Sequence, residues 1–554
     1  MRCRWVIKAI SEQARAISRR QNISAILAQV LLDRDVPEDD FGLFLKPALE
    51  NLDSPSLLPD IDKAVSRIQE AVSSKERVLV YGDYDVDGVT ALAIFNEFAK
   101  KHPGIFDFYI PHRLQEGYGL NSEAVVKAAD EGFSLILAFD CGTNSCREIE
   151  LAKGRGIDVI VVDHHLAAKD GLASPYALVN PKQPQSQYPF KDLSAGGLSF
   201  KFLQALTGLD CREVLDLAAL STVCDVVPLR GENRIIVKEG LAQLRCSQRQ
   251  AIKALCQVSS LKQENIDAMH LGFILGPRIN ACGRMAHANE ALQLFLSEDL
   301  AHALELAGRM QEYNRSRKDV ESAVLKEAES LVETNFAGDK AIVVHKDGWH
   351  AGVLGIVAGR LADKYCRPAF VISLDDERGK GSGRSPAGVH LMDLLAQCSA
   401  HLKSYGGHQK AAGIHIDKTA IEAFRLTLNS ALKEKVDPQA LVPSLSIQAQ
   451  ICLDQINLKL VEELESLKPF GEENPKPLFV TRGLLKRSPV KKAGQGYYLW
   501  VSDGAATYEA GIYDKDLLDI IEYSAAFDAV FSIERNTYRN EPRLTIKDAR
   551  INSD

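Results

Sequence analysis

Acidic and histidine side chains follow three apolar segments of this chain at the points where those segments end. In chain order they are Asp83, Asp85 and Asp87 after residues 77–82, Asp140 after 134–139, and Asp163, His164 and His165 after 157–162. A further acid, Asp225, ends an apolar helical stretch. Carboxylates are hard ligands that suit Mg²⁺ or Mn²⁺, and imidazoles shift the preference toward Mn²⁺. Two such ions roughly 3.5–4 Å apart can hold both the attacking and the leaving oxygen of a phosphoryl displacement, so these residues favour a two-metal phosphoesterase.

Two simpler interpretations of these acids compete with a metal site. A single Asp in a strand-to-helix turn is more often a helix N-cap than a ligand. The run from Asp83 to Gly88 also resembles the start of an EF-hand calcium loop, but Ile94 stands where that loop needs a Glu. Neither interpretation accounts for acids that follow three separate apolar segments.

Alternating strands and helices are expected to bring the acids together. Four segments are short, nearly continuous apolar runs, 77–82, 105–110, 134–139 and 157–162, and the stretches 89–101, 121–131 and 146–154 between them have helical character. This alternation predicts an α/β fold with a parallel sheet covered on both faces. Because ligands of such sheets bind beyond the carboxyl ends of the strands, we expect the acids to meet at one edge.

The remainder of the chain predicts three further regions. Residues 289–334 contain no Pro and predict one long helix that bridges two domains. A second α/β region follows, with strands at 341–345 and 369–374 on either side of a helix near 353–365. After about residue 442, short strands separated by turns predict a small β-barrel.

The composition excludes several classes of protein. Hydrophobic residues make up 46% and charged residues 25% of the 554 residues, and no apolar run is long enough to cross a bilayer. The 11 cysteines include no CxxC pair, which argues against a zinc module and favours reduced thiols in the cytoplasm. The net charge of −8 gives no general attraction to nucleic acid, so such a substrate would need bound cations and locally placed Arg and Lys.

The acidic motifs and Asp225 resemble the four motifs of the DHH phosphoesterases. Further segments resemble the RecJ branch of that family, in the same order and over nearly the whole chain: 110–121, 275–285, 381–386, 406–413 and 468–477. The resemblance implies a metal-dependent exonuclease that degrades single-stranded DNA from 5′ to 3′ in repair and recombination, with two divalent cations, Mn²⁺ or Mg²⁺, as cofactors. It also implies a single-strand-binding protein and a helicase as partners, and no membrane.

The same resemblance implies a division of the chain into five parts. They are an N-terminal helical segment packing on the catalytic domain (1–76), a DHH catalytic domain (77–285), a linking helix (286–335), a DHHA1-like substrate-binding domain (336–440) and an OB-like nucleic-acid-binding domain (441–554). A channel too narrow for duplex, between the two α/β domains, would then select single strands.

The family also assigns roles to residues at matching positions. The expected metal ligands are Asp85, Asp87, Asp140, His164 and Asp225, with Asp140 as the bridge between the ions. Asp83, His164 and His165 are expected to act in catalysis, with His165 positioning the scissile phosphate and Asp83, nearer the strand, supporting the ligands from behind. Tyr81 stands where many members of the family carry His.

Two groups of side chains are expected to hold the strand. The first comprises Arg113, Arg278, Asn280, Arg284, Ser382, Arg384 and His408. We expect the glycine-rich residues 379–386 to form a turn that cradles phosphate, and the resemblance implies a pocket for a terminal 5′ phosphate made by Arg113, Ser382 and Arg384. The second group is Arg487, Lys491, Lys492, Tyr498 and Trp500 in the barrel. The two aromatic residues could instead belong to the barrel core.

Two other functions compete with this one. A pyrophosphatase or phosphodiesterase that acts on short nucleotides would use the same metal site, but the length of the chain, the segment 265–285 and the barrel argue against it. A non-catalytic replication scaffold is expected to have lost metal ligands, whereas the five expected ligands are all present.

Overall fold

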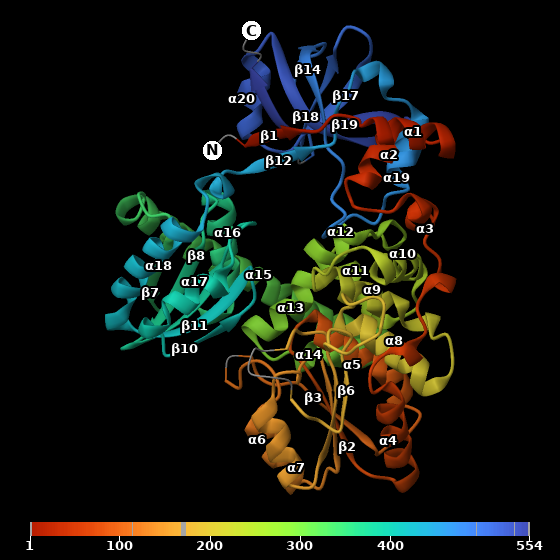
Figure 1. The fold of residues 1–554 in the computed structure, drawn as a ribbon, viewed down its shortest axis with the longest axis vertical. Helices are drawn as coiled ribbons and strands as arrows, with labels where there is room; N and C mark the ends of the chain where they lie inside the picture. Colours follow the sequence, from red (N-terminus) through yellow and green to blue (C-terminus); the bar gives the residue numbers. More distant parts are fainter. Residues whose placement is uncertain (1–2, 114, 168–172, 495, 537, 552–554) are drawn as a thin grey trace.

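Five parallel strands form the first sheet, in the order β3-β2-β4-β5-β6 (Figure 1). The structure is a computed structural model that describes residues 3–113, 115–167, 173–494, 496–536 and 538–551. The strands are β2 (Val78–Gly82), β3 (Phe106–Tyr109), β4 (Leu135–Phe139), β5 (Asp158–Val162) and β6 (Ala177–Val179). Every residue of β2 and β4 is buried, which explains why these strands are continuous apolar runs. The four predicted strands are confirmed, while β6 is too short to stand out in the sequence.

Helices cover both faces of this sheet. On one face α4 (Ile61–Ser74), α5 (Val86–Ala99), α8 (Ala195–Thr207) and α9 (Leu215–Cys224) share one core with the strands, together with α10 (Gly231–Cys246) and α11 (Gln250–Val258). On the other face lie α6 (Ser122–Asp130) and α7 (Cys146–Gly154). The doubly covered α/β architecture is therefore as predicted.

The long helical region consists of two helices, so the prediction of a single helix over 289–334 is wrong. Helix α14 (Asn289–Leu296) ends before α15 (Leu300–Asn335) begins. The break arises because the Asp299 carboxylate accepts a hydrogen bond from the His302 amide (2.8 Å) and caps the second helix. The N-terminal half of α15 packs in the core of the first sheet and its C-terminal half against the second sheet, so this helix joins the two α/β domains.

The second sheet has the order β10-β11-β9-β8-β7. Its elements are β7 (Ile342–Asp347), α16 (Leu354–Tyr365), β8 (Ala369–Asp375), β9 (Arg378–Arg384), α17 (Leu391–Gln397), β10 (Ser404–Gly407), β11 (Ala411–Asp417) and α18 (Ile421–Lys435). The expectation of a glycine-rich turn at 379–386 is wrong, because residues 378–384 form the central strand β9. Its glycines let neighbouring side chains approach: a Cβ on Gly383 would lie 2.4 Å from the Phe370 ring. Residues 382 and 384 point to the opposite face of the sheet.

A closed barrel follows, with the strand order β13-β14-β18-β19-β17-β16-β15 and a closing pair between β14 and β16. The strands are β13 (Ala449–Gln450), β14 (Phe479–Lys486), β15 (Lys491–Ala493), β16 (Gly496–Ser502), β17 (Thr507–Ile512), β18 (Ala526–Asn536) and β19 (Glu541–Ile551), and the helices are α19 (Leu458–Glu465) and α20 (Asp516–Tyr523). The predicted barrel is thereby confirmed. Among the described residues, no helix is both long enough and apolar enough to cross a membrane.

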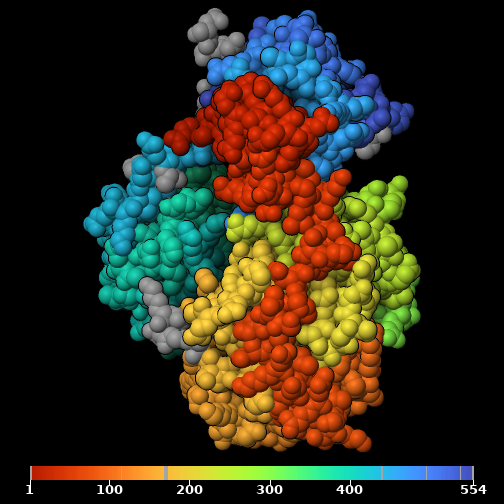
Figure 2. Space-filling model, turned by 45° about the vertical axis from the view of Figure 1, so that its right-hand side comes forward, coloured from red at the N-terminus to blue at the C-terminus, as the bar shows by residue number. Residues whose placement is uncertain are grey.

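The first part of the N-terminal segment packs on the barrel, and the expectation that residues 1–76 pack on the catalytic domain is wrong for this part. Strand β1 (Arg4–Ile7) pairs with β12 (Ser444–Ile447), and α1 (Glu12–Gln21) and α2 (Ala25–Leu32) share the barrel core. The chain then crosses to the first α/β domain, as the red and orange atoms of Figure 2 show. The buried Arg234 guanidinium ties the parts together by donating to carbonyls of residues 44 and 466–469.

The packing of the second sheet predicts unequal effects for alanine substitutions at two of its glycines. Gly383→Ala places a methyl against Phe370 and should lower the free energy of unfolding of this domain by about 1–3 kcal/mol, the usual cost of overpacking. Gly413→Ala, on the neighbouring strand with nothing within 4 Å of its Cβ, should change it by less than about 1 kcal/mol. Urea unfolding followed by circular dichroism measures both, and equal losses would contradict the packing argument.

Candidate metal centre

Carboxylates and imidazoles from separate loops meet at the carboxyl edge of the first sheet. Two groups of possible metal ligands share no residue, and in each of them one donor atom per residue lies within 4.8 Å of the others: Asp83, Asp85 and Asp140; and Asp87, His164 and Asp225. A third group of the same kind, Asp140, Asp163, His164 and His165, overlaps both. Asp140 links the two groups, because its Oδ1 lies 3.4 Å from Nε2 of His164. The arrangement offers two adjoining cation sites with one carboxylate between them.

Helix α5 begins inside this cluster. Its N-cap is Asp85, whose side chain accepts hydrogen bonds from the amides of Asp87 (2.9 Å) and Gly88 (3.3 Å). Asn280 adds a third contact, because its Oδ1 accepts a hydrogen bond from the Val86 amide (3.1 Å). Asp85 therefore caps a helix and also contributes to a possible metal site.

Asp87 is the most firmly held of these acids. Its Oδ2 accepts from the Ala195 amide (2.8 Å) and its Oδ1 from the Gly196 amide (2.9 Å), both in the first turn of α8. The Ser221 hydroxyl on α9 donates to the same Oδ1. The carboxylate thereby faces the positive end of a helix, which stabilises its charge.

Asp163 organises the loop after β5, because its carboxylate accepts hydrogen bonds from groups of this loop and of the loop after β4. It accepts from the amides of Thr143 (3.0 Å), His164 (2.7 Å) and His165 (3.2 Å) and lies 2.7 Å from Nδ1 of His165. Burial acts to raise the pKa of Asp163, but the hydrogen bond and charge of His165 hold it well below its usual range. Burial acts to lower the pKa of His165, and the Asp163 carboxylate raises it above its ordinary value.

Mutual repulsion dominates the electrostatics of the cluster. Burial raises the pKa of Asp83, Asp140 and Asp225 well above the ordinary value, and neighbouring carboxylates raise each of them further. Burial also lowers the pKa of His164 to about 4, which favours the neutral imidazole that binds metal. Asp83 Oδ1, Asp225 Oδ2 and His164 Nδ1 are buried without a hydrogen-bond partner among the described residues. Divalent cations fit this donor set, since they would neutralise the carboxylates and occupy open oxygens.

Asp83 and Tyr81 differ in how they relate to the cluster. Asp83 lies within reach of Asp85 and Asp140, so it could bind a cation directly as well as support the other ligands. Tyr81 points to the other face of the sheet. There its hydroxyl donates to the Gly119 carbonyl (2.8 Å) and accepts from Asn121 (3.1 Å).

Arginines gather beside the cluster, where the two α/β domains meet. Arg284 donates to the Gly352 carbonyl (3.0 Å), directly before α16, and Arg384 on β9 lies against Gly355 of that helix. The Arg113 guanidinium lies over the Tyr84 ring, 4.6 Å from its centre. Burial and the charges of Arg113, Arg317 and Arg384 lower the pKa of Arg284 to about 9. So much concentrated positive charge beside carboxylates suits a phosphate group.

The structure also brings His408 to the site. It follows β10, and its ring stacks on His165 with centroids 5.9 Å apart. Ser382 points to the same face of β9 as Arg384. Two other predicted substrate residues make hydrogen bonds within the protein: Asn280 accepts from the Val86 amide at the start of α5, and Arg278 donates to Gln311 (2.7 Å) and to the Ile274 carbonyl (2.5 Å).

The barrel residues face away from the barrel core. Tyr498 and Trp500 alternate with Leu499 and Val501, and only the latter pair belongs to the core, so the alternative assignment of the aromatic pair to the core is wrong. Lys491 on β15 pairs in register with Tyr498, and the Arg487 amide donates to the Trp500 carbonyl (2.8 Å). Basic and aromatic groups thus share one surface of the barrel. Lys492 is exposed beside Lys491.

Several residues near the cluster had no signal in the motifs. Asn180 after β6 donates to Thr143 Oγ1 (3.0 Å) and to the His165 carbonyl (2.9 Å) and so supports the histidine loop. Val226, Met269 and Phe273 are exposed apolar residues, and the last is 79% exposed on a one-turn π-helix, η6 (Leu271–Leu275). This turn packs on the end of α9 that carries Asp225.

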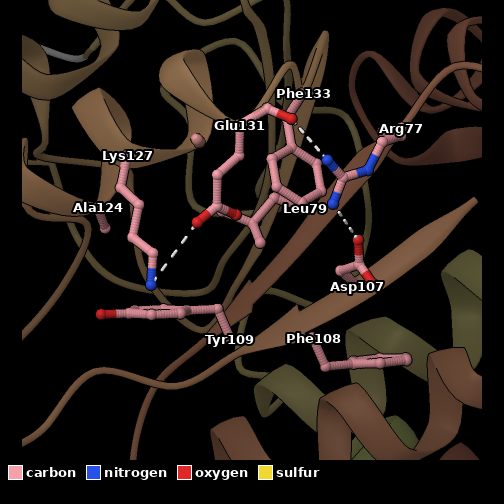
Figure 3. Close-up of a pocket in the computed structure, with 10 residues that line it drawn as sticks. Arg77, Leu79, Asp107, Phe108, Tyr109, Ala124, Lys127, Glu131 and Phe133 are labelled. Carbon is pink, nitrogen blue, oxygen red and sulfur yellow. Dashed lines mark hydrogen bonds and ion pairs between the residues drawn. The ribbon is translucent and has the colours of Figure 1, made fainter.

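A pocket of about 330 Å³ lies on the first α/β domain beside edge strand β3 and α6 (Figure 3). Its charged groups are already paired: Arg77 with Asp107 (2.8 Å) and with the Glu131 carbonyl (2.5 Å), and Lys127 with Glu131 (3.8 Å). No residue of the metal cluster lines it. This pocket is therefore separate from the candidate site.

Known proteins match the chain over its whole length. Three family models match in order: the DHH family, N-terminal domain (77–222), the DHHA1 domain (338–434) and the RecJ OB domain (447–548). The single-stranded-DNA-specific exonuclease RecJ of Bacillus subtilis is 34% identical, over 99% of this chain and 71% of the relative. That of Haemophilus influenzae is 31% identical, over 92% and 89%. The chain belongs to the RecJ family.

Solved structures of RecJ extend the agreement to the fold. RecJ of Thermus thermophilus in complex with Mn²⁺ matches with a TM-score of 0.84 at 28% identity, over 100% of this chain and 80% of that one. The same protein in complex with Mg²⁺ matches with a TM-score of 0.79 at 26% identity, over 100% and 79%. Two α/β domains, the long helix between them and a terminal barrel are thus shared with RecJ.

The raised carboxylate pKa values predict how acidity affects the metal-free protein. Groups whose pKa is raised on folding stabilise the protein at low pH, and this contribution is lost as the pH rises through the folded-state pKa. In the presence of a chelator at pH 8, the free energy of unfolding of Asp140→Asn should therefore exceed that of the natural protein by roughly 1 kcal/mol, the value of one pKa unit. This difference in the free energy of unfolding should become smaller toward pH 5.

Urea midpoints at both pH values measure this difference. Asp107→Asn, at the far end of the same sheet, is the matched control and should show no such pH-dependent gain. A urea midpoint of the natural protein that equals or exceeds that of Asp140→Asn at pH 8 would contradict the repulsion between the carboxylates.

Proposed function

We propose that this chain is a metal-dependent exonuclease that degrades single-stranded DNA from its 5′ end. The observation that carries the proposal is the pair of ligand groups joined by Asp140, next to a cluster of arginines. The names of the RecJ relatives, single-stranded-DNA-specific exonucleases, supply the substrate. The cations are Mn²⁺ or Mg²⁺, the two ions found with RecJ of T. thermophilus.

The protein side chains divide the work of the reaction. Asp83, Asp85 and Asp140 would hold one cation, and Asp87, His164 and Asp225 would hold the other, with Asp140 between the two groups. When bound, the cations supply Lewis acidity, which lowers the pKa of an attacking water and stabilises negative charge on the phosphate oxygens. His165, oriented by Asp163 and stacked on His408, is placed to hold the scissile phosphate.

The arginines supply the direction of degradation. Arg113, Arg284 and Arg384 lie beside the cluster, and the first turn of α16 lies against Arg384. A terminal phosphate carries more negative charge than an internal one, so this cluster of arginines would bind a terminal phosphate more tightly than an internal one. A strand held there by its 5′ phosphate would present its first phosphodiester to the cations.

Exposed apolar and aromatic residues support a single-stranded substrate. Phe273 and Met269 lie beside the loop of Asp225, where unpaired bases could contact them. Tyr498 and Trp500 share the outer surface of the barrel with Lys491. Base stacking and backbone attraction on such surfaces need no particular sequence.

A cleavage assay tests the proposed activity. With Mn²⁺, single-stranded DNA labelled at its 3′ end should shorten stepwise from its 5′ end, and matched duplex and RNA should be spared. Asp140→Ala should abolish the shortening because it removes the group between both cation sites. Intact DNA with hydrolysis of dinucleotides or pyrophosphate would favour the short-nucleotide enzyme instead.

A second experiment tests the direction of degradation. Arg384→Ala should reduce the preference for 5′-phosphorylated over 5′-hydroxyl strands by roughly 10- to 100-fold in kcat/KM, the value of a charge-assisted hydrogen bond. Arg378→Ala, an exposed Arg at the other end of β9, is the matched control and should leave the preference unchanged. A preference that survives Arg384→Ala would place the phosphate pocket elsewhere.

The cellular setting and domain roles also follow from the proposal. The enzyme would act in the cytoplasm, in repair and recombination, with a helicase and a single-strand-binding protein that deliver the strand. The DHH domain (77–285) would carry the chemistry, and the domains at 336–440 and 441–554 would bind the substrate. Residues 286–335 would connect them.

A further inference from the structure

The cluster acids differ in how their oxygens are satisfied. Asp83 Oδ1 and Asp225 Oδ2 are buried without a hydrogen-bond partner among the described residues. Both oxygens of Asp87, in contrast, accept hydrogen bonds from α8, at Ala195 and Gly196, and Oδ1 accepts a further one from Ser221. Asp87 is thus held in one orientation before any cation arrives.

The Ser221 hydroxyl donates its hydrogen bond to Asp87. A carboxylate only accepts, so the bond between Ser221 and Asp87 requires Ser221 to donate. Its oxygen in turn accepts from the Gly196 amide (3.0 Å) and lies 2.9 Å from the Ser194 hydroxyl, which can donate to it. Ser221 therefore connects Asp87 to the N-cap of α8, Ser194.

The fit between α8 and α9 depends on glycine. A Cβ on Gly196 would lie 2.3 Å from Ser221 Oγ and 2.4 Å from Ser221 Cβ. Only a residue without a side chain lets the amide and the hydroxyl reach the same carboxylate. The two helices thus meet at a contact that serves Asp87.

This orientation matters to one of the two cation sites. Oδ2 of Asp87 lies 3.6 Å from Nε2 of His164, and Nε2 lies 3.7 Å from Oδ2 of Asp225. We propose that Ser221 is a positioning residue that fixes the Asp87 carboxylate and thereby sets the cation affinity of the site formed by Asp87, His164 and Asp225. The inference rests on the proposed function for the presence of cations, but it concerns binding and not cleavage.

Mn²⁺ binding to the full chain tests the proposal. In Ser221→Ala, one of two Mn²⁺ sites should weaken about 10- to 100-fold, the usual effect of losing a residue that orients a ligand. The other site, at Asp83 and Asp85, should keep its affinity. Electron paramagnetic resonance of free Mn²⁺ and isothermal titration calorimetry measure both sites without substrate.

Ser199→Ala is the matched control. Ser199 lies on α8, is 1% exposed, and its hydroxyl has no partner among the described residues, so its loss removes a buried hydroxyl without touching the cluster. This variant should bind Mn²⁺ as the natural protein does. Ser221→Cys keeps nearly the same side-chain volume but has a weaker hydrogen-bond donor. The Mn²⁺ affinity of its weakened site should lie between those of the natural protein and Ser221→Ala. This variant preserves the test should the alanine variant fail to fold.

The outcomes separate this inference from the proposed function. Unchanged Mn²⁺ affinity in both Ser221 variants, or equal losses in Ser199→Ala, would overturn the positioning role even if strands are cleaved. A site-specific loss in the Ser221 variants supports it even if the natural protein fails to degrade DNA, a result that would sink the proposed function alone.

Discussion

The structure depends on the repulsion between buried carboxylates at one edge of the first sheet, which bound cations would relieve. Asp83, Asp140 and Asp225 are brought together by strand ends and a helix end, and burial with mutual repulsion raises their pKa values. The parallel sheet creates the arrangement because β2, β4 and β5 end at the same edge. Much of the surrounding structure supports this edge: Asp163 fixes the histidine loop, α8 holds Asp87, and Asn280 caps α5. A fold that concentrates negative charge in this way suits divalent cations and the phosphate they attract.

The remaining domains place further charged groups beside the acidic cluster. Helix α15 carries the second sheet to the side of the first, so that Arg384 on β9 and Arg284 on α13 (Gly276–Met285) come together. The N-terminal segment and the Arg234 guanidinium tie the barrel to the first domain. The arginines beside the acidic cluster and the basic and aromatic surface of the barrel therefore come from regions distant in sequence, whereas the candidate metal ligands all come from one domain.

Local signals in the sequence predicted the centre well and its surroundings poorly. Apolar runs followed by acids are local patterns, so the sheet, its strands and the clustered acids could be predicted. The contact of Asn280 with Val86 spans 194 positions and leaves no local trace. The glycines of β9 suggest a turn, yet their spacing of two is also that of a strand whose face packs against Phe370 and Ile372. Helices α1 and α2 pack on the barrel instead of the catalytic domain, because their apolar faces do not specify which core they join, whereas α4 in the same segment packs on the first sheet as expected.

Asp140 would lie between two cations held by this cluster. Anomalous diffraction from crystals of the protein soaked in Mn²⁺, recorded at the manganese absorption edge, can locate these ions. We expect two peaks, one beside Asp83 and Asp85 and one beside Asp87, His164 and Asp225, with the Asp140 carboxylate contacting both. A single peak, or two peaks that do not share Asp140, would contradict this expectation.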